Sequence, residues 1–349
     1  MIRMVATIIL TVSLASLAFA GPQTVVKDGS KVYIKGVDRL QWNKGLDCTF
    51  MGALTALARY LGDDVTYDYL MGVSGMAFRV QKWEQGWCPS AACVGPGYET
   101  HAKAFDALGY QMGFRGWYGD KTDTDKIAAM REPIMKSIDQ GYPILFEDMD
   151  NGLIVGYSDD GNKLLCRSYF DKDDQYTQAA HWPWSIFFLE KKDKPIERKT
   201  AVNDSLRIAL EEADTEKFNG YYSGWAAYDN WIAALRDEAK FTDKKHTEGS
   251  AQPNRFMYAV LADGRAAAAR FLRSVQNDLG DESKPHILKA AALYQQIAKK
   301  LDVGRKHLPG EGKTWTKEMR KSQATVLMEV SKLEKQAIGE LKAALASAG

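Results

Sequence analysis

This chain has few cysteines and few histidines, and its basic and acidic residues nearly balance. Its 349 residues include four cysteines and five histidines, and 46 basic against 45 acidic residues give a formal net charge of +1. This balance gives no reason to expect nucleic acid or an anionic membrane as a partner. Only one cysteine pair is close in sequence and the histidines are not clustered, which argues against a zinc site. The acidic loops lack the spacing and closing glutamate of a calcium loop, so we expect neither a metal nor another cofactor.

Long apolar runs are also missing, except at the start of the chain. Residues 1–20 carry one positive charge at Arg3, an apolar run over 5–17 and the small-residue pattern Ala18-Phe19-Ala20. This pattern predicts a secretory signal peptide that is cleaved after Ala20. An uncleaved anchor is the alternative, but the run is short for a membrane span. We therefore expect a secreted or periplasmic protein without stable membrane insertion after cleavage.

Export changes how the four cysteines are interpreted. Cys88 and Cys93 lie close together in the segment WCPSAAC, and near neighbours tend to pair in an oxidising compartment. We expect a disulfide between them, with two reduced thiols or a different pairing as alternatives. Cys166 lies in an alternating apolar run and is expected to be a buried strand residue. Cys48 then remains as the free thiol.

Cys48 lies where a helix is predicted to begin. In the segment 45–62 the apolar residues have helical spacing, Asp47 is a suitable cap and Gly62 is a suitable end. Unpaired backbone N–H groups and the dipole at a helix start favour a thiolate. Cys48 is therefore a candidate nucleophile, and the alternative is a small apolar residue that happens to begin a helix.

The remaining pattern predicts an α+β region followed by helices. Residues 24–37 read as a hairpin, 98–110 as a helix and 124–141 as a helix interrupted near Pro133. Four apolar runs at 142–149, 151–158, 162–170 and 184–192 predict an antiparallel sheet. A charged connector with Pro195 covers 191–200, and only helical spacing follows from 203. We expect a signal peptide over 1–20, a domain over 21–195 and a bundle of about five helices over 203–349, which either binds a partner or caps the first domain.

Four short motifs in this order resemble a known family. The segments 47–62, 69–79, 87–90 and 152–161 are similar to the family named after the N-terminal domain of butirosin biosynthesis protein H, which belongs to the papain-like, C39-like group. The resemblance covers about residues 36–190, and the segment 224–235 with the following helices resembles the C-terminal region of uncharacterised bacterial members. It implies a papain-like fold, with N-terminal helices and a late antiparallel sheet. It also implies a cysteine nucleophile, aided by histidine and oriented by Asp or Asn, for acyl transfer or hydrolysis.

The chain departs from the family pattern at the partners of the cysteine. The position expected for histidine, six residues before Gly156, is Asp150, and the next strand ends at Ser168 and Tyr169 rather than at an Asp or Asn. The position expected for an oxyanion-hole glutamine is Trp42. Aspartate is a weak base at its ordinary pKa near 4.

Two histidines of the first domain remain as possible bases. His101 is predicted on a helix, where a surface or packing role is the plainer interpretation. His181 is predicted in a loop before the last strand, where packing against aromatic residues is the plainer one. The candidate catalytic residues are therefore Cys48, Asp150 and His181.

Two functions stay open at this point. The first is an exported, non-catalytic protein that binds a peptide or a small acyl or amide ligand in a cleft around Cys48. The alternative is a cysteine-dependent amide hydrolase or acyltransferase that uses Cys48 with a non-standard base. The missing histidine favours the first, and the sequence does not determine the oligomeric state.

Overall fold

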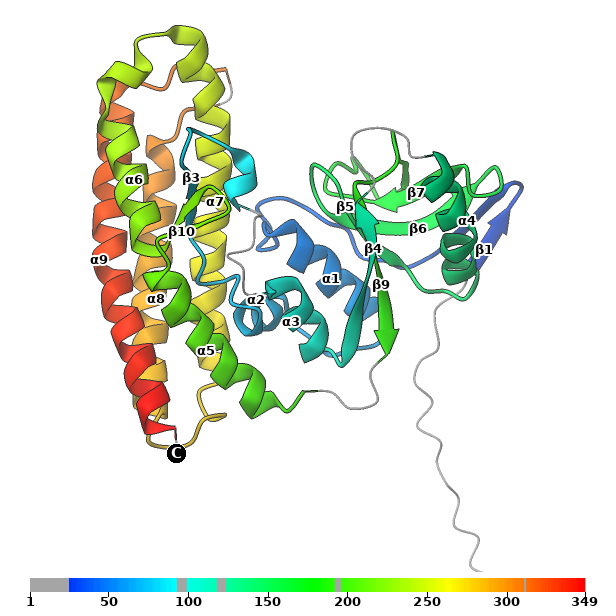
Figure 1. The fold of residues 1–349 in the computed structure, drawn as a ribbon, viewed down its shortest axis with the longest axis horizontal. Coiled ribbons are helices and arrows are strands. Elements are labelled where there is room, and N and C mark those ends of the chain that lie inside the picture. The colour runs from blue at the N-terminus through cyan, green and yellow to red at the C-terminus, as the bar shows by residue number, and fades with distance from the viewer. Residues whose placement is uncertain (1–24, 93–98, 118–123, 192–195, 311, 349) are drawn as a thin grey trace, which may run out of the picture.

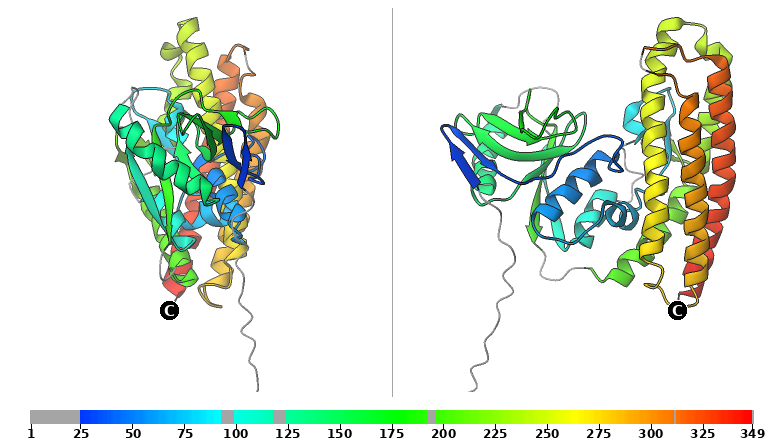
Figure 2. Two further views of the ribbon diagram at one scale, coloured as in Figure 1. Left: turned by 90° about the vertical axis from the view of Figure 1, so that its right-hand side faces the viewer. Right: turned by 180° about the vertical axis from the view of Figure 1, so that it is seen from behind.

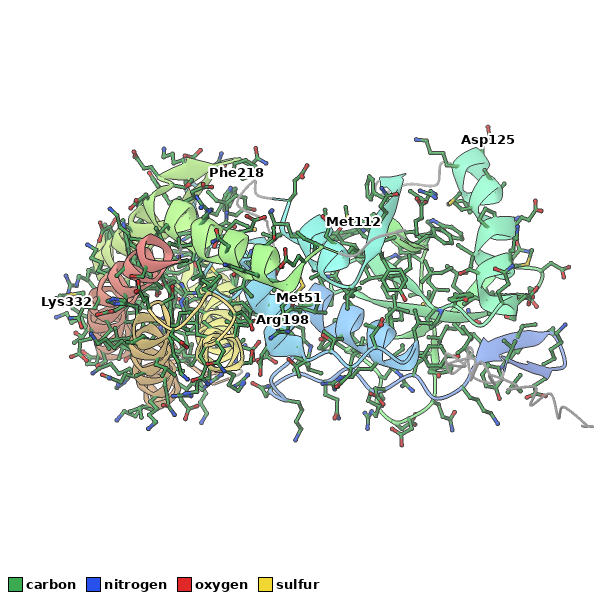
Figure 3. All side chains as sticks on the ribbon, turned by 90° about the horizontal axis from the view of Figure 1, so that it is seen from below. Met51, Met112, Asp125, Arg198, Phe218 and Lys332 are labelled. Carbon is green, nitrogen blue, oxygen red and sulfur yellow. The ribbon has the colours of Figure 1, made fainter. Side chains whose placement is uncertain are left out.

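The computed structural model describes residues 25–92, 99–117, 124–191, 196–310 and 312–348. Within these ranges the chain is α+β, with an antiparallel sheet in the first half and long helices in the second. Helices α1 to α3 lie between the sheet and the long helices (Figures 1 and 2). Figure 3 shows the two ends of this arrangement, with Asp125 beside the sheet and Lys332 on the outermost helix. No described helix is both long and apolar enough to span a membrane. The predicted signal peptide lies outside the described residues.

The main sheet has eight strands in the described part of the chain. Its order is β1-β2-β6-β5-β9-β4, with β7 paired to β6 and β8 paired to β7, and every pairing is antiparallel. The strands are β1 (Val25–Asp28), β2 (Lys31–Ile34), β4 (Tyr110–Trp117), β5 (Ile144–Glu147), β6 (Gly152–Ser158), β7 (Lys163–Arg167), β8 (Thr177–Gln178) and β9 (Ser185–Lys191).

The hairpin and the four late strands of the sheet follow the sequence pattern. Gly29 has a φ of +58° at the turn between β1 and β2, a conformation that glycine adopts at little cost. β5, β6, β7 and β9 form at the four predicted apolar runs. Cys166 lies in β7 and is buried, as expected.

The helices of the first half support the sheet and meet the second half. α1 packs on β5 and β6, α4 packs on β2 and β6, and α2 packs on a helix of the second half. Their bounds are α1 (Thr49–Tyr60), α2 (Tyr67–Val73), α3 (Thr100–Ala107) and α4 (Thr124–Asp139). The predicted interruption near Pro133 is wrong, because α4 runs through Pro133 without a break.

The second half begins with α5 at Arg198, three residues beyond Pro195. Part of the predicted connector, residues 192–195, lies outside the described residues. The long helices pack as neighbours, α7 on α8 and α8 on α9, with α6 and α5 against α9. They are α5 (Arg198–Asp214), α6 (Gly224–Arg236), α7 (Lys244–Ser274), α8 (Lys284–Gly304) and α9 (Lys317–Ser347).

A second, small sheet joins the two halves. Its strands are β3 (Gln81–Trp83), β10 (Lys217–Phe218) and β11 (Tyr221–Ser223), in the order β10-β11-β3. The expectation of helices alone after residue 203 is therefore wrong. Strands of two or three residues carry too little periodicity to be recognised, and β11 is held by pairing with β3 about 140 residues earlier.

One buried hydrophobic cluster extends through both halves. It contains residues of the main sheet, of α1 and α2, and of the long helices. Arg265 of α7, which is fully buried, adds polar contacts across the boundary. Its Nη1 donates to the carbonyl oxygens of Ala77 and Arg79, both at 2.9 Å. The two halves therefore share a core as well as a sheet.

Candidate functional site

Cys48 is the residue that caps the start of α1. Its backbone is extended, with φ −81° and ψ 98°, and its carbonyl oxygen accepts the first helical hydrogen bond from Gly52 at 2.9 Å. Asp47 is therefore not the cap that the sequence predicted, because the helix begins one residue later. The Asp47 carboxylate instead accepts a hydrogen bond from the backbone N–H of Asn43 at 2.7 Å and orders the preceding loop.

A tyrosine and an aspartate from different halves support the backbone of Cys48. The Cys48 N–H donates to the Tyr67 hydroxyl at 3.0 Å, and this hydroxyl donates to Oδ2 of Asp263 at 2.6 Å. The same Asp263 oxygen accepts the N–H of Asp47 at 3.2 Å. Asp263 belongs to α7, so the second half of the chain fixes the beginning of the cysteine helix.

The Cys48 thiol lies in a protected environment. The residue is only 4% exposed, and burial raises the pKa of its thiol. The charge of Arg79 and the backbone N–H groups of Met51 and Phe50 act in the opposite direction, whereas the charge of Asp263 adds to the rise. Desolvation is the largest of these effects, so the helix start does not produce a thiolate at neutral pH.

Aromatic side chains lie close to the cysteine helix. Tyr169 donates its hydroxyl hydrogen to the carbonyl of Leu46 at 2.6 Å. A Cβ at position 52 would lie 2.0 Å from the Tyr169 hydroxyl oxygen, so glycine is required there for this close approach. Trp42 packs between Tyr169 and Phe256 of α7, with ring centroids 4.9 and 5.2 Å away. At the position expected for an oxyanion-hole glutamine, the chain therefore has an indole that packs across both halves.

Asp148 interacts with both Asp150 and His181. The His181 Nδ1 lies 3.4 Å from Oδ2 of Asp148, and the imidazole is largely exposed. Burial, together with the charge of Asp148, raises the pKa of Asp150 to about 7. Oδ1 of Asp150 is buried and has no hydrogen-bond partner among the described residues. Asp150 is thus a weaker acid than a free aspartate, which the sequence did not predict.

The loop that carries Asp150 touches the cysteine helix one residue further on. Asn151 donates its backbone N–H and its side-chain amide to Oγ1 of Thr49, at 3.2 and 2.8 Å. The contact with the start of α1 is thus made by Asn151, the residue after the position expected for histidine. The charges that shift the Cys48 pKa, however, are those of Arg79 and Asp263.

His101 contributes a neutral ring to the core. Its imidazole stacks on Phe50, with centroids 3.6 Å apart and planes within 7° of parallel. Burial, and then the charge of Arg79, lowers the pKa of His101 to about 4. At neutral pH this imidazole is uncharged, in agreement with the packing role expected from the sequence.

A cleft of about 730 Å³ lies between the loop 43–47, which precedes the cysteine helix, and the helices α7 and α8. We call it the charged cleft. Cys48, around which the sequence predicted a cleft, is not among its lining residues. Alanines of α7 and α8 leave the cleft open, and Asp47, Asp263 and Asp302 line it. Burial, the largest cause in each case, raises the pKa of the Asp47 and Asp263 carboxyl groups, that of Asp263 to about 6. Cationic residues also line the cleft: Arg270, Arg273, Lys299 and Arg305. The volume is in the range of small-ligand sites.

The expected disulfide partners cannot both be located. Cys93 lies outside the described residues, so the pairing of Cys88 with Cys93 stays a prediction. Cys88 is half-buried, and its Sγ lies 3.8 Å from the Tyr221 hydroxyl of β11. Among the described residues no group of three His, Cys, Asp or Glu side chains could hold a metal ion.

Comparison of the chain with known proteins identifies no related family. No protein-family model matches the chain, and a search of curated proteins finds no match.

Asp263 and Arg265 are the important residues that the sequence reasoning missed. They lie in the helical segment VLADGRAAAAR, where nearly every other residue is small or apolar. Charged residues at buried positions need partners, so an isolated Asp and Arg in such a segment are a usable signal. Their partners in the first half are about 190 to 220 residues earlier, and Glu334, the ion-pair partner of Arg265, is 69 residues later. None of them shares a local pattern with this segment of α7.

Proposed function

We propose that this is an exported protein of papain-like layout that binds a short peptide in the charged cleft, without using Cys48 as a nucleophile. The observation that carries the proposal is the burial of the Cys48 thiol together with the raised pKa that burial causes. The hydrogen bonds at the helix start, to Tyr67 and through it to Asp263, serve to hold the backbone. The cysteine helix beside a late antiparallel sheet agrees with the layout that the family resemblance implies.

The charges of the cleft suit a zwitterionic ligand. Asp47 and Asp263 offer carboxylates to an ammonium group. Arg273 and Lys299 offer donors to a carboxylate, whereas Arg305 pairs with Asp302. A short peptide with free termini has both groups on one molecule.

Calorimetric titration with trialanine tests this ligand class. The free tripeptide should bind, and both N-acetyl-trialanine and trialanine amide should bind more weakly. Lys299→Gln should weaken binding about fivefold, since an exposed charge pair contributes up to about 1 kcal/mol. The matched control is Lys300→Gln, because Lys300 pairs with Glu329 and does not line the cleft. Equal affinities for the free and capped peptides would refute the zwitterion assignment.

One observation favours a second candidate function. The pKa of Asp150 is raised to about 7 by burial and Asp148, and its Oδ1 is buried without a hydrogen-bond partner. A carboxylate with such a pKa is a competent base near neutral pH. It supports a cysteine-dependent amide hydrolase or acyltransferase in which Asp150 takes the place of the family's histidine.

Alkylation of the native protein separates the two functions. Under the binding function, iodoacetamide at neutral pH should modify Cys48 no faster than the buried Cys166, as followed by peptide mass spectrometry, and Cys48→Ala should retain peptide binding. Rapid modification of Cys48 that slows in Asp150→Asn would instead support the enzyme and refute the non-catalytic assignment.

A further inference from the structure

A second cleft, of about 680 Å³, lies over the sheet and shares no lining residue with the charged cleft. The β1–β2 hairpin, the segment 35–39, β7 and the segment 174–176 surround it. We call it the hairpin cleft. Nothing in the proposed function uses it.

The strands beside the hairpin cleft pack closely at one glycine. Gly156 of β6 pairs with Tyr33 of β2 on one side and with Leu165 of β7 on the other. A Cβ at position 156 would lie 2.7 Å from Cβ of Tyr33 and 2.6 Å from the carbonyl oxygen of Val32. Glycine is therefore required at position 156, because β2 packs too closely on β6 there for a side chain. Tyr33 and Leu165, its neighbours on the two adjacent strands, both line the cleft.

The interior of the cleft contains cations, one of them deeply buried. Arg167 is only 3% exposed, donates Nη1 to Oδ2 of Asp171 at 2.8 Å and donates Nη2 to the carbonyl of Asp174 at 3.0 Å. Its guanidinium carbon lies 4.5 Å from the centroid of the Tyr176 ring. Arg39 lies beside it and donates Nη2 to the carbonyl of Asp171 at 3.2 Å.

Each of these arginines has a donor that is not used. The Nε atoms of Arg39 and Arg167 are buried and have no hydrogen-bond acceptor among the described residues. The nearest carboxylate to the Arg39 Nε belongs to Asp174, at 3.5 Å, and that side chain is 86% exposed. A buried donor without an acceptor is costly, and guanidinium groups can only donate. The interior is therefore suited to a ligand that supplies acceptor oxygens.

The charged residues at the rim of the cleft do not alter this preference for a ligand with acceptor oxygens. Asp28 and Asp38 lie at the rim with Lys31 and Lys35, and all four side chains are exposed to solvent. Their charges balance. Inside the cleft Arg167 is paired with Asp171, and the Arg39 Nε lies 3.5 Å from Asp174. The two unused Nε donors, rather than a net positive charge, therefore favour a ligand with acceptor oxygens.

We propose that the hairpin cleft binds a small oxyanion carried on a flat apolar ring, such as an aromatic phosphate or carboxylate. The oxyanion accepts from Arg39 and Arg167, whose charges strengthen such hydrogen bonds. The ring lies against Leu165 and the edge-to-face pair of Tyr33 and Tyr176, which line the cleft and whose centroids are 6.2 Å apart.

Calorimetric titration of the full chain with phenyl phosphate tests the site, with inorganic phosphate and phenol as partial ligands. Phenyl phosphate should bind more tightly than either part alone. Arg39→Gln should weaken it about tenfold, as expected for the loss of a charge-assisted hydrogen bond. Arg115→Gln is the matched control, because Arg115 has comparable exposure and pairs with Glu190 on the β4–β9 side of the sheet. Peptide binding in the charged cleft should be unchanged in both variants.

Lys35→Gln provides a second variant at an exposed position, where folding is not at risk, and it should weaken phenyl phosphate about fivefold. No binding at roughly 1 mM phenyl phosphate would overturn the proposal. Equal losses in Arg39→Gln and Arg115→Gln, or tighter binding of phenol than of phenyl phosphate, would also overturn it.

Discussion

Replacement of Glu334 by glutamine should destabilise this protein more than any exposed charge change. Glu334 of α9 faces Arg265 in a two-pronged ion pair, with Nε to Oε2 at 2.9 Å and Nη2 to Oε1 at 2.6 Å. The side chains are 0% and 4% exposed, and the Tyr228 hydroxyl also donates to Oε2 at 2.6 Å. Glu334→Gln leaves the buried guanidinium without a countercharge, which costs about 3–5 kcal/mol. This is a large share of an ordinary folding free energy of about 5–15 kcal/mol.

The same helix offers a control. Glu329 pairs with Lys300 at 2.6 Å, but both side chains are about half exposed. Glu329→Gln should therefore cost less than about 1 kcal/mol. Equilibrium unfolding in urea, followed by tryptophan fluorescence, gives both values, and the m-values show whether the unfolding transition is the same in both variants.

Removing both charges should not restore full stability here. Arg265 also supplies the hydrogen bonds to the carbonyls of Ala77 and Arg79. The double variant Arg265→Met with Glu334→Leu leaves these two carbonyls without a donor, at about 1–3 kcal/mol each. Equal costs for Glu334→Gln and Glu329→Gln, or a double variant as stable as the parent, would refute this account of the buried pair.

Two further predictions concern pH and packing. Burial raises the pKa of Glu212 from 4.5 to about 8. Between these values the native state keeps a proton that the unfolded chain has released, so the free energy of unfolding falls as the pH rises through this interval. Glu212→Gln should reduce this loss, measured as the change in urea midpoint between about pH 5 and about pH 8, whereas exposed Glu211→Gln should not. Gly72→Ala should destabilise by about 1–3 kcal/mol, because its Cβ would lie 2.0 Å from Cγ of Phe271. Gly339→Ala, with open space around it, should stabilise α9 by about 0.5–1 kcal/mol in the same assay.

The elements that the sequence predicted well are those whose pattern is local. The hairpin around Gly29, the helix after Cys48 and the four late strands each contain their own turn residues and periodicity. β4 was missed, because Gly113 interrupts its alternation and its register is set by pairing with β9. β10 and β11 were missed for a similar reason, since long-range pairing with β3 stabilises them.

The features of the candidate site that the sequence predicted are likewise the local ones. The position of Cys48 at a helix start could be read from neighbouring residues. Its burial and its link to Asp263 could not, because they depend on α7, more than 200 residues later. The raised pKa of Asp150 also arises from burial in the folded chain, so its sequence position suggested a weaker base than the structure provides.

The shared small sheet has a consequence for the order in which the protein can fold during synthesis. β3 can pair with β11 only after residue 223 has been synthesised, and the carbonyls of Ala77 and Arg79 lack their hydrogen-bond donor until Arg265 has been synthesised. The segment between α2 and β3 is therefore left with open hydrogen-bonding groups while the first half emerges. Asp263 comes equally late, so the start of the cysteine helix is completed only when α7 has been synthesised. A nascent chain that stopped at the connector could form the large sheet. In it, however, β3 would lack its partner strand, and the start of the cysteine helix would lack the hydrogen bonds that depend on Asp263.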